Sequence, residues 1–392
     1  MSPPERGTTT SSITLYYLFI YGAIGITLPF FPQYLKSLGL SGTEVGLLLS
    51  VSPALSLVAP PLWGQLADRT GRPGLILLVV TGSACACFGL FLVVRSFAAV
   101  FFVFVVYGCF ASAISTLIDS MTLRHVARSG GSYARLRLWG SIGFATMSLS
   151  FGRLVDVIDE RVVVVTVVLT ALGTAWTAIG LSRVRVVAAA GPRPDFRAAL
   201  GLAESREVRL FLIAVALHWF ACGPYHSALS IHVTAMKLPN RVIGDAATLG
   251  VLSEIAIMMT WPRWGHVFSP RKLLFVSFAA SAVRWAGVAL TTNGDVLVAL
   301  GLLHSLTFGV FFLSAVAFMA ERSPETLRAT GQALFVAAAF GVGGLLGYLA
   351  TGVGLDLLPS SHAVFGIAAG LELVPALLVL QLPQNGRGEV TS

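Results

Sequence analysis

One acidic side chain, Asp119, stands inside a long apolar segment, and Arg137 follows it 18 residues later. An isolated carboxylate in hydrocarbon costs several kcal/mol, so Asp119 must carry a proton or face the interior of a helix bundle with a partner. The chain turns near Gly130 and Gly131, and the two charged residues differ in distance from that turn by about 6 Å of helix rise, which an arginine side chain can span. Arg135 and Arg137 are two apart on one helix, so only one of them can face Asp119.

A second set of ionisable residues lies in later apolar segments and comprises Glu254, Arg284, His304 and Glu372. Burial disfavours the charged form of a glutamate, whereas a nearby arginine favours it. A glutamate whose arginine moves by a few ångströms between conformations therefore loads and unloads a proton. The alternative is a structural Glu–Arg pair with a hydrogen-bonded histidine. No motif surrounds Glu372, and we interpret it as structural.

Other chemistries find no support in the residue pattern. The cysteines lie inside apolar segments without ligand spacing, and the histidines near 218–232 share no ligand motif. They are Cys85, Cys87, Cys109 and Cys222, and His218, His226 and His232. We expect no metal site and no cofactor. The sequence also has no phosphate loop and no nucleophile elbow, so we do not expect an enzyme.

The segments that must position these residues are membrane helices. The chain of 392 residues is 56% hydrophobic and only 11% charged, whereas soluble domains average about 25% charged. Apolar runs of about 20 residues, each long enough to cross about 30 Å of hydrocarbon, recur along the sequence. We predict twelve spans near 14–37, 43–66, 74–94, 97–122, 136–157, 162–182, 208–234, 243–264, 272–291, 296–319, 329–350 and 361–381.

The basic residues predict the orientation of these spans. With the N-terminus inside, 19 of the 26 lysines and arginines fall on the cytoplasmic side. Both termini are then cytoplasmic, and the polar start of the chain has no signal-peptide cleavage pattern. The net charge of +8 reflects this bias and the anionic inner leaflet rather than nucleic acid. We expect a multi-pass protein of a bacterial-type inner membrane, in contact with lipid and monomeric.

The longest polar connection divides the spans six and six. We predict an N-terminal half over 1–183, a cytoplasmic linker over 184–206 and a C-terminal half over 207–392. The segment "GQLADRTGRP" (64–73) after span two has a weak copy, "GHVFSPRK" (265–272), after span eight. A duplicated six-helix unit with a midplane cavity is the plan of many secondary transporters.

The segment "GQLADRTGR" resembles the loop signature of the major facilitator superfamily. Gly64, Asp68, Arg69 and Arg72 fall in its pattern, where they imply conformational gating. Gly64 allows close helix approach, and Asp68 is expected to accept from a helix N-terminus of the other half. The segments "LPFFPQYLKSLGLS", "APPLWGQLADR", "YARLRLWGSIGF" and "CGPY" resemble the branch of lactose permease, the nucleoside/proton symporters and the phenylpropionate-type permeases.

This resemblance assigns the solute site. Lactose permease has a sugar-binding carboxylate and arginine, also 18 residues apart, on the same two helices, which selects Arg137 and implies a charged pair with Asp119. A salt bridge that only holds two helices together remains the alternative. Aromatic residues fit a cavity wall, although a phenylalanine stands where that permease stacks the sugar on a tryptophan. The predicted substrate-binding residues are Asp119, Arg137, Tyr21, Trp139, Phe144 and Tyr225.

The resemblance also assigns proton coupling, to Glu254, Arg284 and His304. The arginine and histidine match the permease's coupling cluster, but its acid positions are Thr307 and Val251 here. Glu254 lies one turn beyond Val251 on nearly the same helix face, so we infer that one displaced carboxylate replaces two.

The function expected is proton-coupled symport of a small organic solute, namely a nucleoside, an aromatic acid or a sugar-like compound. A proton-coupled exporter of amphipathic compounds would use the same fold. A membrane sensor or enzyme is the third possibility, but no soluble output domain or catalytic motif supports it.

Overall fold

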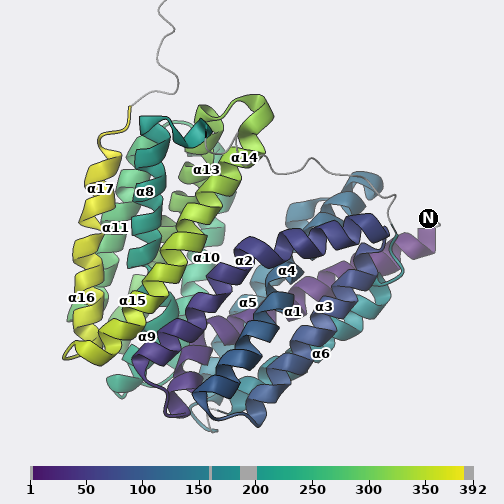
Figure 1. Cartoon of the computed structure of the whole chain (residues 1–392), viewed down its shortest axis with the longest axis horizontal. Helices are drawn as coiled ribbons and strands as arrows, with labels where there is room; N and C mark the ends of the chain where they lie inside the picture. The colour runs from purple at the N-terminus through teal and green to yellow at the C-terminus, as the bar shows by residue number, and fades with distance from the viewer. Residues whose placement is uncertain (1–2, 159–160, 186–200, 384–392) are drawn as a thin grey trace, which may run out of the picture. The chain divides into compact units, whose positions relative to one another are not determined.

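The computed structural model describes residues 3–158, 161–185 and 201–383, which form helices and no strand (Figure 1). The helices of the first part are α1 (Pro3–Ser37), α2 (Gly42–Thr70), α3 (Pro73–Gly89), η1 (Leu90–Leu92), α4 (Phe97–Ser129), α5 (Tyr133–Leu154) and α6 (Val162–Leu181). Those of the second part begin with α8 (Arg206–Ala221), α9 (Gly223–Ala235), α10 (Arg241–Trp264) and α11 (Pro270–Leu290). The chain then forms α12 (Gly294–Leu300), η2 (Gly301–Leu303), η3 (Ser305–Val310), α13 (Phe311–Arg322), η4 (Glu325–Leu327), α14 (Arg328–Val336), η5 (Ala337–Gly343), α15 (Gly344–Leu357), α16 (Ser361–Leu371) and α17 (Leu373–Val379).

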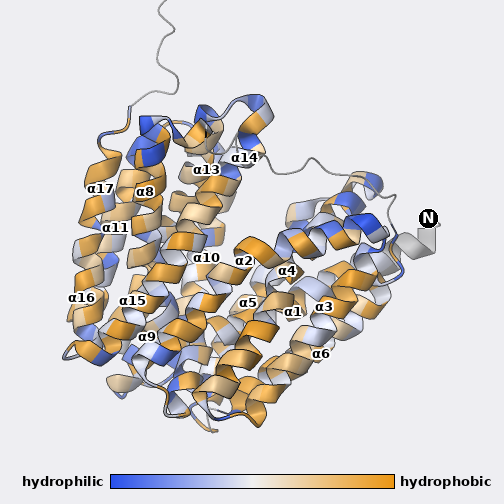
Figure 2. Ribbon diagram, in the orientation of Figure 1, coloured by the Kyte–Doolittle hydropathy of each residue, from blue (hydrophilic) through white to orange (hydrophobic). Residues whose placement is uncertain are grey.

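Eleven helical segments among the described residues are long and apolar enough to cross a membrane. Figure 2 shows hydrophobic residues over most of each helix and hydrophilic residues gathered at helix ends and connections. The predicted fifth span, α5, falls outside the eleven because it carries Arg135, Arg137 and Arg153 among small and hydroxylic residues. It has 22 residues, enough to span the hydrocarbon core. The prediction of an all-α membrane protein is confirmed. The eleven segments and α5 together give twelve helical segments of membrane-spanning length among the described residues.

Four spans of the second part are interrupted. The seventh breaks at Cys222, between α8 and α9, where Gly223 and Pro224 follow. The twelfth breaks at Glu372, between α16 and α17. The tenth contains a π-helical segment, η3, and the eleventh contains another, η5. Segments of π-helix are rare and are frequent at functional sites, so these interruptions indicate a functional region in the second part of the chain.

The described contacts divide the chain into two compact units. Unit 1 comprises residues 1–40, 51–191 and 239–244, and unit 2 comprises 41–50, 192–238 and 245–392. In unit 1, α1 packs against α5 and α6, and α3 packs against α4 and α6. In unit 2, α11 packs against α13, α16 and α17, and α8 packs against η5 and α17. The division into halves at a linker over 184–206 stays a prediction, and most of that linker lies outside the described residues.

Each unit includes a short segment from the other half of the sequence, and a helix begins in that segment. In unit 2, the carboxylate of Asp356 accepts hydrogen bonds from the backbone N–H groups of Gly42 and Thr43, each at 2.7 Å, and from the Thr43 hydroxyl. In unit 1, Asp156 accepts in the same way from the backbone N–H groups of Asn240 and Arg241. The first N–H groups of a helix have no partner within it, so both carboxylates act as N-terminal caps supplied from a distant part of the chain.

Candidate transport site

Small residues bring α1 and α5 together closely enough to place the first charged side chains. A Cβ atom on Gly143 would lie only 2.1 Å from the backbone oxygen of Leu18, so α5 needs glycine to pack at this distance. A Cβ atom on Gly140 would meet the Tyr21 ring at 2.9 Å and the Arg137 guanidinium at 2.7 Å. The glycines of "RLWGSIGF" therefore open the space in which Arg137 meets α1.

Arg137 lies against aromatic rings and not against a carboxylate. Its guanidinium carbon is 3.8 Å from the ring centroid of Tyr21 and 5.7 Å from that of Tyr17. Among the described residues, no ion pair joins Asp119 to Arg137, so the predicted direct pair is wrong for this structure. The Tyr17 hydroxyl, 2.6 Å from Asp119, donates to the carboxylate instead. Arg135 on the same helix is exposed, which agrees with the register in which Arg137 faces inward.

The other substrate-binding predictions occupy different surroundings. Trp139 is 42% exposed, and Phe144 is half-buried with its backbone against Gly25 of α1. Tyr225, in unit 2, stacks on Arg284, whose guanidinium carbon is 4.2 Å from the ring centroid. Each unit thus holds an arginine on the face of a tyrosine, an arrangement worth about 0.5–2 kcal/mol and open to further hydrogen bonding at the guanidinium edge. Whether these residues bind a solute stays a prediction.

The predicted proton-coupling residues come together in unit 2. His304 Nε2 lies 3.6 Å from Glu254 Oε2, and Arg284 donates to His304 Nδ1 at 3.3 Å. Arg284 also donates to the Thr307 hydroxyl at 2.9 Å. His304 faces one donor and one acceptor, so a neutral ring with its proton on Nε2 satisfies both contacts. Glu254 and His304 keep 17% and 14% of their side chains exposed, whereas Arg284 is buried.

A fully buried charged cluster in unit 2 is not recognisable from the sequence as one site. His218 and Glu372 are both 0% exposed, and His218 Nδ1 lies 3.0 Å from each oxygen of the Glu372 carboxylate. Trp285 donates to Glu372 at 3.3 Å, and the Cys222 thiol lies 3.9 Å from it. The sequence predicts only a structural role for Glu372, because its partner is 154 residues away and no local pattern indicates the pairing.

The gating motif has a charged partner within unit 1. Asp68 pairs with Arg124 of α4 at 3.2 Å, both side chains being about 40% exposed, and its contact with a helix N-terminus of the other half stays a prediction. An exposed pair of this kind contributes roughly 0.2–1 kcal/mol. A Cβ atom on Gly64 would meet nothing within 4 Å, and close helix approach at this glycine stays a prediction. Arg69 and Arg72 are exposed, as their predicted position at the membrane interface requires.

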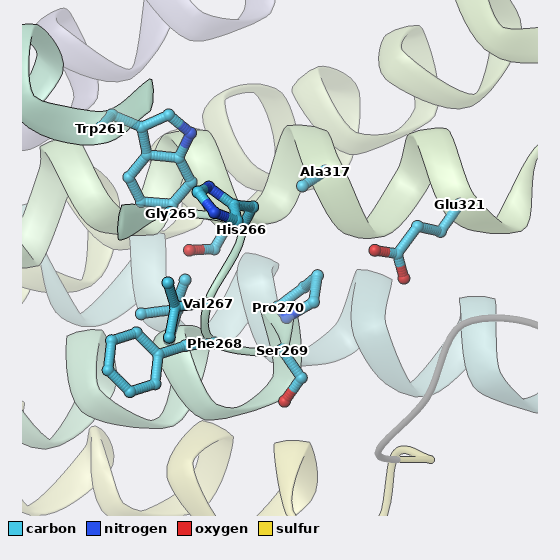
Figure 3. A pocket seen from close by; sticks show the side chains of 11 residues that line it. Trp261, Gly265, His266, Val267, Phe268, Ser269, Pro270, Ala317 and Glu321 are labelled. Carbon is cyan, nitrogen blue, oxygen red and sulfur yellow. The ribbon is translucent and has the colours of Figure 1, made fainter. Parts of the chain in front are cut away.

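A cavity of about 490 Å³ lies beside the second copy of this motif, at residues 265–270. Figure 3 shows Trp261 and His266 at one side of it and Glu321 of α13 at the other. None of the predicted substrate-binding or proton-coupling residues lines this cavity. It is therefore separate from the charged clusters described above.

These features define a class: a polytopic helical membrane protein with buried charged residues on interrupted helices. The chain matches the MFS_1 like family over residues 10–365 and belongs to it. Over 338 residues it is 32% identical to the maltose permease of Geobacillus stearothermophilus, covering 84% of this chain and 83% of the permease. It is 28% identical to the probable 3-phenylpropionic acid transporter of Escherichia coli (strain K12), covering 95% and 97% of the two chains.

A solved transporter structure has the same fold. The structure of a mutant of the nucleoside transporter NupG superposes with a TM-score of 0.85 at 16% identity, covering 95% of this chain and 99% of NupG. The resemblance to the major facilitator superfamily is therefore confirmed. The chain is a multi-pass membrane transporter for small molecules, and its relatives are transporters rather than enzymes.

Proposed function

We propose that the chain is a proton-coupled symporter that imports a small organic solute by alternating access. It would act as a monomer in a bacterial-type inner membrane with both termini in the cytoplasm. The distribution of basic residues supports this orientation. Family membership supports transport, and the cluster of Glu254, His304 and Arg284 supports the coupling to protons.

The observation that carries the proton coupling is the chain of contacts from Glu254 through His304 to Arg284. Glu254 is one of few acids deep in apolar segments, and its side chain is 17% exposed. When it is ionised, the imidazole of His304 faces it at 3.6 Å, and Arg284 supplies a compensating positive charge on the far side of that ring. Protonation of Glu254 removes the negative charge that holds Glu254, His304 and Arg284 together. Proton binding is thereby linked to the position of two helices, α10 and α11.

The solute site is proposed at Arg137, Tyr21 and Asp119 in unit 1. The Arg137 guanidinium lies over the Tyr21 and Tyr17 rings, and among the described residues it donates no hydrogen bond to an acceptor. A planar guanidinium in this state fits a carboxylate, which it binds through two parallel hydrogen bonds. The Tyr21 ring beside it fits a flat or ring-shaped solute. A small aromatic carboxylate is the solute class that these contacts favour.

A glycoside is the second candidate, because the maltose permease is 32% identical. Sugar hydroxyls would donate to Asp119 and accept from Arg137. Tyr17 already occupies one oxygen of Asp119, which leaves less acceptor capacity for a sugar. An exporter of amphipathic compounds would share the fold and differ in the direction of proton movement.

The test is uptake into proteoliposomes that contain the purified chain. Radiolabelled 3-phenylpropionate, maltose and uridine are supplied with and without an inward proton gradient, and external pH is followed. The proposal expects gradient-dependent accumulation of one solute with alkalinisation outside. Acidification outside would identify an exporter, and accumulation of maltose or uridine alone would reject the carboxylate assignment.

A further inference from the structure

Three interrupted helices of unit 2 meet at one buried cluster. Cys222 marks the break between α8 and α9, Glu372 marks the break between α16 and α17, and Thr307 lies in the π-helical segment η3. His218 touches all three: Glu372 through Nδ1 at 3.0 Å, and Thr307 and Cys222 through Nε2 at 3.2 Å and 3.8 Å. Discontinuous helices in transporters supply groups that bind ions and substrates. The cluster thus has the architecture of an ion site.

The partners of His218 fix how many protons the cluster holds. Nδ1 faces the Glu372 carboxylate and Nε2 faces the backbone oxygen of Thr307, and both of these groups accept hydrogen bonds. If the ring is neutral and the carboxylate is ionised, the single N–H of the ring is on Nδ1 and donates to Glu372. The lone pair of Nε2 then faces a lone pair of the Thr307 oxygen, which is unfavourable. The geometry therefore requires one more proton, as imidazolium with carboxylate or as neutral imidazole with carboxylic acid. His304, which faces one donor and one acceptor, needs no such proton.

The cluster also contains a donor for the state that lacks this proton. The Cys222 thiol lies within reach of both Nε2 and Glu372 Oε1. When the ring loses its Nε2 proton, the S–H group can turn to donate to the Nε2 lone pair, and Thr307 no longer has a donor at its carbonyl. The Thr307 hydroxyl accepts a hydrogen bond from the guanidinium of Arg284, so the residue that receives the Nε2 contact is also tied to a cation.

We infer that the His218–Glu372 pair binds one exchangeable proton, and that its release transfers the Nε2 contact from the carbonyl of Thr307 to the thiol of Cys222. The proton passes from the pair to water, and the charge of the pair changes from zero to minus one. Since Thr307 lies in η3, which begins directly after His304, and its hydroxyl binds Arg284, proton release at this pair also alters the surroundings of two members of the Glu254–His304–Arg284 set. The inference rests on the proposed proton coupling and adds a second proton site to it.

All charged and titratable groups described around the pair belong to unit 2. Trp285 of α11 donates to Glu372, its neighbour Arg284 donates to the Thr307 hydroxyl, and Cys222 faces the pair from the end of α8. His226 of α9 stacks on Trp219 at 5.1 Å between ring centroids, next to His218. The remaining rings against His218 are Phe278 and Phe311, which carry no charge. The two phenylalanine rings pack against His218 and contribute to the complete burial of the pair.

Nitrogen NMR of ¹⁵N-histidine-labelled full-length protein in nanodiscs tests this inference without any transported solute. The spectrum is followed between about pH 5 and pH 8, and the His218 signals are identified by their loss in His218→Gln. We expect Nε2 to be protonated at low pH and to lose its proton as pH rises, while Nδ1 is protonated at high pH. An Nε2 that keeps its proton throughout, or never carries one, would overturn the inference.

Substitution of Cys222 tests the transfer of the Nε2 contact to the thiol. It provides a second test if His218→Gln does not fold. Cys222→Ala removes the donor that serves the proton-free ring, so the proton should be held to a pH higher by about half a unit to one unit. Cys222→Ser retains a donor and should restore the midpoint. Cys87→Ala, in unit 1, is the matched control and should change nothing. An unchanged midpoint in Cys222→Ala overturns the thiol's role. A normal titration without proton-driven uptake would reject the proposed symport and leave this site standing.

Discussion

Removal of the Arg137 side chain tests the solute site most directly. If a solute carboxylate binds the guanidinium through two charge-assisted hydrogen bonds, each contributes about 1.5–3 kcal/mol, and together they contribute about 3–6 kcal/mol. At about 1.4 kcal/mol per tenfold change, Arg137→Ala should weaken binding by roughly 10²- to 10⁴-fold. Arg137→Lys should fall between the wild type and Arg137→Ala, because lysine keeps the charge without the planar donor pair.

The same substitution should leave the protein folded. In the described structure Arg137 contributes one stack on Tyr21 and a more distant contact with Tyr17, worth about 0.5–2 kcal/mol. No carboxylate loses its partner, because Asp119 is held by the Tyr17 hydroxyl. The melting temperature in detergent should therefore fall by only a few degrees.

Binding is measured by calorimetry or by scintillation proximity with the solute identified in the uptake test, and stability by thermal unfolding of the same preparations. Arg135→Ala is the matched control, since it removes an equal charge two residues away from an exposed side chain. If Arg135→Ala weakens binding as much as Arg137→Ala does, the register is wrong. If Arg137→Ala unfolds, the residue is structural and the solute site lies elsewhere.

The fold was predictable because hydrocarbon imposes one solution on the chain. Apolar runs of spanning length must be helices, so composition and run length were enough to place twelve of them. The fifth span shows the limit of hydropathy. Its three arginines lower its mean hydropathy below that of a typical membrane helix. Gly140 and Gly143 nevertheless give it a close contact with α1, which a polar surface helix does not need.

The charged residues of both sites were also visible in the sequence, since acids and bases in apolar segments are rare. Their partners were not. Tyr17 and Thr307 are ordinary members of helical segments, and only the packing of distant helices shows that one binds Asp119 and the other binds Arg284. The sequence joined Asp119 to Arg137 through their register across the turn and the resemblance to lactose permease, and it offered no means to place a neutral hydroxyl between helices.

The helix interruptions were partly readable. "CGPY" contains the glycine and proline that follow the break at Cys222, and Pro375 follows Glu372 by three residues. These signals would have linked two helix breaks to two titratable groups. The π-helical segments have no such signal, because the extra residue in a π-turn is fixed by tertiary contacts rather than by local composition.

Two further predictions concern other acids. Glu254→Gln keeps the shape and hydrogen bonding of the side chain but fixes its neutral state, so the variant should exchange solute across a membrane and fail to accumulate it against a gradient; full uphill accumulation in proteoliposomes would reject Glu254 as a coupling site. Asp356→Ala removes the cap that Gly42 and Thr43 share, and loss of such a cap costs about 0.5–2 kcal/mol. Thermal unfolding should show this cost in Asp356→Ala and not in Asp295→Ala, which removes an exposed acid from the start of α12. Equal unfolding temperatures for Asp356→Ala and the wild type would mean that close packing around Gly42, rather than the carboxylate, holds the first turn of α2 in unit 2.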